Sequence, residues 1–460
     1  MQLLGMLFLA RLLRPADYGV MAIAMVVVNL ANLLRDMGTS AAVVQRKELP
    51  DDAIATIFWL NVVVGVILAI AISVVAKIMV LVFASPNLPP VLWLLALGFP
   101  ITASSAVHQA LLERDSRFKL LARIEIVSSF AGLLVAALLA SFHFGVYCLP
   151  FQILTSSILS CIQLWVARSW YPKRRFSRDS FRQLLGYSGN LTVFSLINYL
   201  ARNMDSIVIG KVLGAVQLGI YSQAYRVMLF PLQNMTFVAT RALFPILSGR
   251  QHDIVEARKI YLKTVTLVVT ITAPLMGGMW ILRSEFVQVI FGAKWMAVVP
   301  VLAWLAPVGF IQSIVSTSGT VFMALGNTDK LMRLGVIATI LQVGGFFIGV
   351  RWDINHVAAM YCLSNVINFV IAMEVTMREL GGNLMTLLVA ISRPIVCTSL
   401  MLAGIWVGHR YLAGIGVRDL PLAIYITMLG TAVYGAAGFG WMRSAKFAFH
   451  GCEVAPKGGD

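Results

Sequence analysis

The sequence has little charge and lacks a long polar segment. Of its 460 residues, 12% are charged and 59% are hydrophobic, whereas about one-quarter of the residues in a soluble domain carry a charge. The longest polar stretch covers about residues 168–186 and is far too short to fold on its own. This composition excludes a soluble globular protein and indicates an integral membrane protein.

Cysteine and histidine are also scarce, and neither forms a recognisable site. The five cysteines are scattered and lie mostly within apolar segments, and no spacing resembles a metal knuckle or a redox pair. The six histidines form no His-x-x-x-His or Glu-x-x-His arrangement. We therefore expect neither a catalytic site nor a metal or other cofactor.

Apolar segments recur along the whole chain, most of them long enough to cross about 30 Å of hydrocarbon. There are fourteen, at about residues 1–13, 18–40, 54–84, 90–112, 121–141, 145–167, 187–212, 217–240, 261–283, 298–324, 331–350, 355–377, 386–408 and 421–442. The first reaches only about 20 Å at 1.5 Å per residue, which is too short to span. The sequence predicts an all-α membrane protein with about fourteen transmembrane helices. The first helix is either truncated or a re-entrant half-helix.

The basic residues lie mostly on one side of this predicted topology. With a cytoplasmic N-terminus, 23 of the 36 lysines and arginines lie on the cytoplasmic side, six on the opposite side and seven within spans. Because cytoplasmic loops are enriched in basic residues, we expect both termini in the cytoplasm. The net charge of +16 then reflects orientation and contact with anionic lipids. No stretch interleaves aromatic and basic residues, so nucleic acid is not an expected partner.

A short stretch of sequence occurs twice, about 200 residues apart. Residues 9–20 read LARLLRPADYGV and residues 209–220 read IGKVLGAVQLGI, with glycine in equivalent positions at Gly19 and Gly219. Both copies join two apolar segments, and the spans that precede them enter the membrane from the same side. The repeat predicts two parallel six-helix lobes related by a pseudo-twofold axis along the membrane normal.

The repeat and the charge pattern together divide the chain into four parts. They are an N-lobe at residues 1–168, a basic cytoplasmic linker at 169–186, a C-lobe at 187–380, and two extra helices with a cytoplasmic tail at 381–460.

Polar residues inside the predicted spans are candidates for a transport path, because ionisable groups are costly in a membrane. Asn198, Arg202 and Asp205 are spaced to share one face of a helix. This face serves a substrate or a coupling ion, or alternatively an Arg202–Asp205 pair locks the helix. The other candidates for substrate binding are Arg11, Arg35, Arg123, Lys211, Arg226 and Gln233, and those for a coupling ion are Glu125 and Asp36.

These candidates are dominated by cations accompanied by amides and tyrosines. A path lined in this way attracts an anion with a hydroxyl-rich body, whereas an exporter of cationic drugs requires acids and aromatics. Arg35 and Asp36 have an alternative role, because they lie near the predicted cytoplasmic end of their span and can snorkel to the interface.

Several stretches resemble one family of membrane proteins. They are residues 9–19, 36–46, 198–210 and 219–226, and the motifs PLQN at 231–234, RALFPILS at 241–248, GAKW at 292–295 and ALGNTD at 324–329. Over about residues 1–380 the chain is similar to Wzx-type polysaccharide flippases. It is most similar to the colanic-acid and succinoglycan branch of the superfamily that also contains the multidrug MATE exporters.

The resemblance implies a multi-pass transporter of the bacterial inner membrane rather than an enzyme. Its cargo would be an undecaprenyl-pyrophosphate-linked oligosaccharide, moved from the cytoplasmic to the periplasmic leaflet by alternating access through a cationic central cavity. The implied partners are membrane lipids, a proton or sodium ion, and the polysaccharide polymerase machinery. Two alternatives stay open: a MATE-like antiporter of small molecules, and a membrane polysaccharide polymerase or ligase.

Overall fold

The computed structural model describes residues 8–36, 51–168, 170–172, 196, 199–200, 202–231, 233, 236–251, 253–414 and 427–436. Within these ranges, ten helices are long and apolar enough to cross a membrane. They are Pro15–Arg35, Asp52–Phe83, Leu88–Arg114, Phe118–Ser141, Gly145–Ala167, Ile254–Ile281, Val298–Ala324, Thr328–Gly349, Ile354–Glu379 and Leu384–Tyr411. An all-α membrane fold is therefore confirmed, and each of the ten overlaps a span predicted from the sequence. The total of fourteen stays a prediction.

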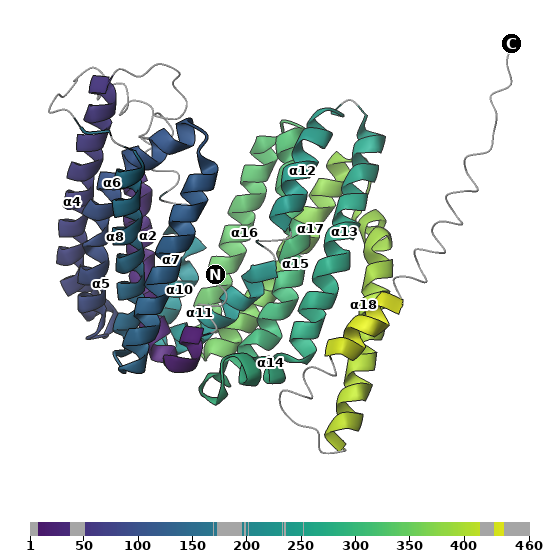
Figure 1. The fold of residues 1–460 in the computed structure, drawn as a ribbon. Coiled ribbons are helices and arrows are strands. Elements are labelled where there is room, and N and C mark those ends of the chain that lie inside the picture. The colour runs from purple at the N-terminus through teal and green to yellow at the C-terminus, as the bar shows by residue number, and fades with distance from the viewer. Residues whose placement is uncertain are drawn as a thin grey trace, which may run out of the picture. The chain divides into compact units, whose positions relative to one another are not determined.

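The chain divides into two compact units, Met1–Ser222 and Gln223–Asp460, each a bundle of steeply inclined helices (Figure 1). The first unit contains α2 (Pro15–Asp36), α4 (Asp51–Phe83), α5 (Leu88–Ala96), α6 (Gly98–Arg114), α7 (Phe118–Ser141), η1 (Gly145–Tyr147), α8 (Cys148–Ala167) and α10 (Met204–Val212). The helix α11 (Gly214–Pro231) crosses the boundary. The second unit continues with α12 (Phe237–Ser248), α13 (Ile254–Ile281), α14 (Arg283–Ile290), η3 (Ala293–Trp295), α15 (Val298–Ala324), α16 (Thr328–Gly349), α17 (Ile354–Glu379) and α18 (Leu384–Gly414). The lobes and the linker predicted from the sequence are defined by membrane topology, whereas the two units are defined by packing. The lobes and the linker therefore stay a prediction.

The helix α4 shows how the chain meets the bilayer. Large apolar side chains along it are exposed, including Ile67, Ile70 and Val74, and Leu81 is 86% exposed. A soluble protein could not leave such a stripe in water, because each exposed aliphatic side chain forgoes about 1.5–3 kcal/mol of burial. In lipid the same stripe is solvated by hydrocarbon tails.

Small residues allow the helices within each unit to pack closely. On α7, buried Ser128, Gly132, Ala136 and Ala140 recur every four residues, and a Cβ on Gly132 would overlap the hydroxyl of Ser156 on α8. In the second unit, Gly345 and Gly349 bring α16 against α17 in a similar way. Helices in lipid associate through such close backbone approach, since hydrocarbon tails remove most of the hydrophobic driving force.

Candidate functional site: a polar cavity and an apolar groove

A polar cavity of about 1140 Å³ lies within the first unit, bounded by α2, α5, α6, α7 and α8. Its polar lining consists of Asn32, Arg35, Thr102, Ser105, Gln109, Glu113, Glu125, Ser128, Ser129, Ser156, Ser157 and Ser160. Small-molecule sites usually measure about 300–1,000 Å³. The cavity therefore has room for a ligand at or above the upper end of that range.

Arg35 is the one cation among the described residues that line this cavity. Its guanidinium donates a hydrogen bond of 2.7 Å to Oγ1 of Thr102. Thr102 is the fifth residue of α6, so this hydrogen bond links the C-terminal end of α2 to the N-terminal part of α6. Snorkelling to the cytoplasmic end, which the sequence allowed as an alternative, stays a prediction for Arg35, because Arg35 is the last residue of the span Pro15–Arg35.

The wall formed by α6, α7 and α8 is rich in hydroxyl groups, and some of them donate their hydrogen to a carbonyl of their own helix. Ser105 donates to the carbonyl of Thr102 at 3.1 Å, and Ser156 donates to the carbonyl of Gln152 at 2.9 Å. Helical serines satisfy their hydrogen in this way and keep oxygen lone pairs available. The wall can therefore accept hydrogen bonds from a ligand that carries many hydroxyl groups.

Two carboxylates complete the lining. Glu113 accepts a hydrogen bond of 2.9 Å from Nε2 of Gln109, and Glu125 is exposed on α7. Glu113 follows Thr102 by eleven residues on α6, which corresponds to about 16 Å along the helix axis. Arg35 and Glu113 thus lie at different levels of the cavity, and the charge of the lining changes along its length.

The shared helical face predicted for Asn198, Arg202 and Asp205 is wrong for the two residues that are described. The helix is interrupted at Asn203, whose backbone leaves the helical region (φ −108°, ψ 12°), and α10 begins after it. Arg202 is exposed, whereas Asp205 is buried and accepts a hydrogen bond of 2.6 Å from the backbone N–H of Ser206. No ion pair joins Arg202 and Asp205 in this part of the chain, so the alternative role as a locking pair is also wrong. Asn198 lies outside the described residues.

The remaining candidates are spread over the surface of the described helices. Exposed side chains that do not line the polar cavity are those of Arg11, Arg123, Lys211, Arg226 and Gln233. The side chain of Asp36 lies outside the described part of the chain. Of the sequence-predicted residues, the structure brings Arg35 and Glu125 to one cavity. The serines on α7 and α8 were missed, because a hydroxyl group hardly interrupts an apolar segment.

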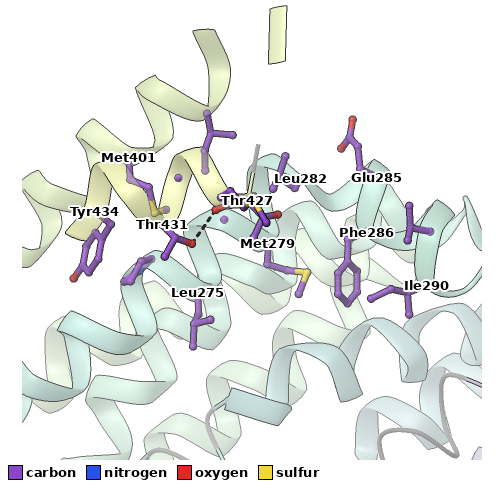
Figure 2. Close-up of a pocket in the computed structure, with 16 residues that line it drawn as sticks. Leu275, Met279, Leu282, Glu285, Phe286, Ile290, Met401, Thr427, Thr431 and Tyr434 are labelled. Carbon is purple, nitrogen blue, oxygen red and sulfur yellow. Dashed lines mark hydrogen bonds between the residues drawn. The ribbon is translucent and has the colours of Figure 1, made fainter. Parts of the chain in front are cut away.

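An apolar groove of about 670 Å³ lies in the second unit (Figure 2). It is lined by α13, α14, α18 and residues 427–436. The view shows Met279, Phe286 and Ile290 on one side and Met401 and Tyr434 on the other. The lining is almost entirely hydrocarbon, sulfur and aromatic carbon, which suits a lipid chain and not a sugar.

The charged side chain in the lining of this groove is that of Glu285. Its carboxylate accepts hydrogen bonds from Nε2 of His409 at 3.0 Å and from the hydroxyl of Ser284 at 2.9 Å. Burial acts to raise the pKa of Glu285, but hydrogen bonds from its own backbone N–H, from His409 and from Ser284 outweigh burial. The net result is a pKa below the ordinary value, so the carboxylate is ionised at neutral pH.

Comparison with known proteins identifies the family of this chain. The family model described as polysaccharide biosynthesis protein matches residues 8–300. The chain belongs to the polysaccharide biosynthesis protein family. The resemblance to Wzx-type flippases in its sequence is thereby confirmed.

Curated relatives are similar to this chain over most of its length. The lipopolysaccharide biosynthesis protein WzxC of Escherichia coli (strain K12) is 28% identical over 83% of this chain and 78% of its own length. The succinoglycan biosynthesis transport protein ExoT of Rhizobium meliloti (strain 1021) is 25% identical over 92% of this chain and 85% of its own. Both match well beyond the residues that line the polar cavity.

A solved structure identifies the fold of this polysaccharide biosynthesis protein. The lipid II flippase MurJ, in an inward closed conformation, superimposes with a TM-score of 0.73. The match covers 96% of both chains at 12% sequence identity. The two proteins therefore share a fold.

Proposed function

We propose that this protein moves a lipid-linked oligosaccharide from the cytoplasmic to the periplasmic leaflet of the bacterial inner membrane, with both termini in the cytoplasm. The observation that carries the proposal is the polar cavity within an otherwise lipid-facing bundle. Such a cavity has no place in a purely structural membrane protein, because each unsatisfied polar group in hydrocarbon is costly. Membership of a polysaccharide biosynthesis family supports a saccharide as the ligand.

The two cavities match the two chemistries of such a cargo. The hydroxyl-rich wall of the polar cavity suits sugars, and Arg35 suits a phosphate oxygen of the pyrophosphate linker. The apolar groove suits part of the isoprenoid chain of undecaprenyl pyrophosphate. An inside-negative membrane potential favours outward movement of an anion by about 2.3 kcal/mol per charge per 100 mV.

The other cations and amides serve the same path as secondary contacts. Those assigned to the cargo are Arg11, Arg123, Asn198, Arg202, Lys211, Arg226 and Gln233. Asp205 is the foremost candidate for coupling to a proton or sodium ion, because it is a buried acid within an apolar helix. Glu125 and Asp36 are the further candidates, and the polysaccharide polymerase machinery is the expected partner downstream.

A second function is favoured by one observation. The polar cavity contains Glu113 and Glu125 together with the rings of Phe99 and Phe118, and acids beside aromatics suit an organic cation. A MATE-like antiporter of small cations is therefore the second candidate. Family membership and the hydroxyl-rich wall favour the oligosaccharide.

The deciding experiment replaces Arg35 with alanine. The cargo is a lipid-linked oligosaccharide in proteoliposomes, and its appearance in the outer leaflet is measured. We expect Arg35→Ala to slow transport at least tenfold, since a charge-assisted hydrogen bond contributes about 1.5–3 kcal/mol. Arg351→Ala, at an exposed arginine outside the cavity, is the matched control. Wild-type rates in both variants would remove Arg35 from the path, and export of small cations alone would favour the antiporter.

A further inference from the structure

Two basic side chains project from the apolar surface of the second unit. Lys263 lies on α13 and Arg393 lies on α18, and both are exposed. Each lies nine residues after the first residue of its helix, which is about 14 Å along the axis. With 28 and 31 residues, the two helices are longer than about 30 Å of hydrocarbon. Both cations therefore lie within the membrane but within reach of its polar interface.

The helices α13 and α18 pack side by side (Figure 1). Oγ1 of Thr266 on α13 lies 3.4 Å from the carbonyl oxygen of Ala390 on α18, within hydrogen-bond distance. Further along both helices, a Cβ on Gly277 would lie 3.3 Å from Cγ2 of Thr398. Because the two contacts advance in the same direction, the helices run parallel, and Thr266 and Ala390 lie at the same level.

Helix geometry turns the two cations to the same side of this contact. Lys263 precedes Thr266 by three residues, and Arg393 follows Ala390 by three. In two parallel helices, these opposite offsets rotate both side chains by about 60° in the same lateral direction. They separate the two Cα atoms by about 9 Å along the axis. Lysine and arginine have long side chains, so both charged groups can reach one anion.

The acids near the beginnings of these helices have other partners. The ion pairs are Glu256 with Lys259, Glu374 with Arg378 and Glu379 with Lys330. Within the described part of the chain, the side chains of Lys263 and Arg393 form neither an ion pair nor a hydrogen bond. Because a charge in an apolar surrounding is costly without a counter-ion, this pair requires an anion from outside the described helices.

The surface around the pair suits hydrocarbon chains. Leu267, one helical turn after Lys263, is 60% exposed. Val389 and Val396, about one turn before and after Arg393, are 65% and 57% exposed. A ligand that fits this surface combines an anionic headgroup with apolar chains.

We propose that Lys263 and Arg393 bind the phosphate of an anionic phospholipid whose acyl chains lie along α13 and α18. The guanidinium can donate two hydrogen bonds to the phosphate, and the ammonium adds a second positive charge. The orientation proposed above puts this lipid in the cytoplasmic leaflet, because both helices begin on that side. The bound lipid fastens α18 to α13. The site is separate from the polar cavity of the first unit, and it does not depend on the cargo.

A photoactivatable lipid tests the site in the full-length protein. The protein in nanodiscs is illuminated with photoactivatable phosphatidylglycerol or, separately, with photoactivatable phosphatidylcholine, and the cross-linked peptides are identified by mass spectrometry. Phosphatidylglycerol should label the peptides around Lys263 and Arg393 at least fivefold more than phosphatidylcholine does. Lys263→Gln and Arg393→Gln should each lower this labelling about fivefold, since each removes one cation from the anionic lipid.

Two matched controls come from the same end of the unit. Lys259→Gln and Arg378→Gln each remove an exposed cation that is paired with a glutamate, and both should leave the labelling unchanged. Arg393→Lys keeps the charge and should keep most of the labelling. Thermal unfolding in the same nanodiscs verifies that the variants fold. Phosphatidylglycerol should raise the unfolding temperature of the wild type more than that of Arg393→Gln.

The outcomes distinguish this lipid from other ligands. Equal labelling by the two lipids in the wild type overturns the site, and so does unchanged labelling in both Lys263→Gln and Arg393→Gln. Undecaprenyl phosphate that displaces phosphatidylglycerol from these peptides at a tenfold lower concentration overturns the phospholipid assignment. Loss of labelling confined to Lys263→Gln and Arg393→Gln supports the site, whether or not the protein moves an oligosaccharide.

Discussion

The polar cavity of the first unit and the apolar groove of the second are both enclosed by transmembrane helices, yet their walls differ. Hydroxyl groups, amides and Arg35 line the cavity, whereas Met279, Phe286 and Met401 are typical of the groove. The charged side chains of the two linings also differ in their hydrogen-bond partners. Arg35 donates a hydrogen bond to the hydroxyl of Thr102 near the N-terminal end of α6, whereas the carboxylate of Glu285 accepts hydrogen bonds from His409 and Ser284.

This difference indicates that the two units present ligand surfaces of opposite polarity. A polar wall inside a bundle does not disturb the lipid-facing surface, because the hydroxyl groups point inward and their helices stay apolar outside. An apolar groove needs no such protection. The two cavities should therefore respond in opposite ways to the same substitution.

The largest effect is expected for a charge in the groove. Gly278 lines it, and a Cβ there would meet nothing within 4 Å. Gly278→Asp should lower stability by about 2.5–3.5 kcal/mol, the cost of an acid within hydrocarbon. Thermal unfolding in detergent and the amount of protein in membranes measure this loss. Gly278→Ala should behave as wild type, and equal stability of the Asp variant would mean that the groove is wet.

The same acid in the polar cavity should leave the fold intact. Ser157 lines that cavity on α8. Ser157→Asp should preserve the protein level and yet slow transport of an anionic cargo about tenfold, which corresponds to 1.4 kcal/mol. Ser157→Asn is the neutral control of similar size. A stability loss as large as that of Gly278→Asp would show that the two cavities do not differ in polarity.

A smaller effect on stability is expected for a substitution next to Glu285, the acid that lines the groove. His409→Ala removes one hydrogen bond to Glu285 and should lower stability by about 1 kcal/mol at neutral pH. Because the pKa of Glu285 is depressed, its contribution is present above the ordinary carboxyl pKa and is lost as the pH falls through the depressed value. The variant should therefore lose less stability on acidification than wild type. Thermal unfolding at neutral and acidic pH tests this, with the exposed Tyr411→Ala as control.

The smallest effect separates the two candidate functions. Glu125→Gln neutralises an exposed carboxylate in the polar cavity. Transport of a lipid-linked oligosaccharide should change by about fivefold or less, since an exposed charge contributes at most about 1 kcal/mol. Loss of transport would instead identify Glu125 as the coupling residue or as a ligand for a cationic cargo. Glu113→Gln in the same assay shows whether the two acids act alike.

The sequence predicts the membrane spans well, because span length depends on hydrocarbon thickness alone. The contact between Arg35 and Thr102 could not be predicted, since the two residues lie on different helices 67 positions apart in the chain. The break at Asn203 has no glycine or proline to announce it, so Arg202 and Asp205 seemed to share a face. The serines of the cavity were overlooked because hydroxyl groups are compatible with an apolar helix. The repeat was evident from the sequence, but contact between its copies was not.

The close contact between α2 and α11, where Gly19 meets the carbonyl oxygen of Ala215 and Gly219 meets that of Pro15, has a consequence for the evolution of the chain. Two equivalent surfaces that meet across a twofold axis are what a homodimer of a half-length chain would present. In such a dimer every mutation occurs in both subunits, so both sides of the axis change together. Once the halves are joined in one gene, each copy can change alone, as the different residues at the equivalent positions Pro15 and Ala215, and Asp17 and Gln217, illustrate. Gly19 and Gly219 cannot change independently in this way, because a side chain at either position would displace the backbone of the other copy.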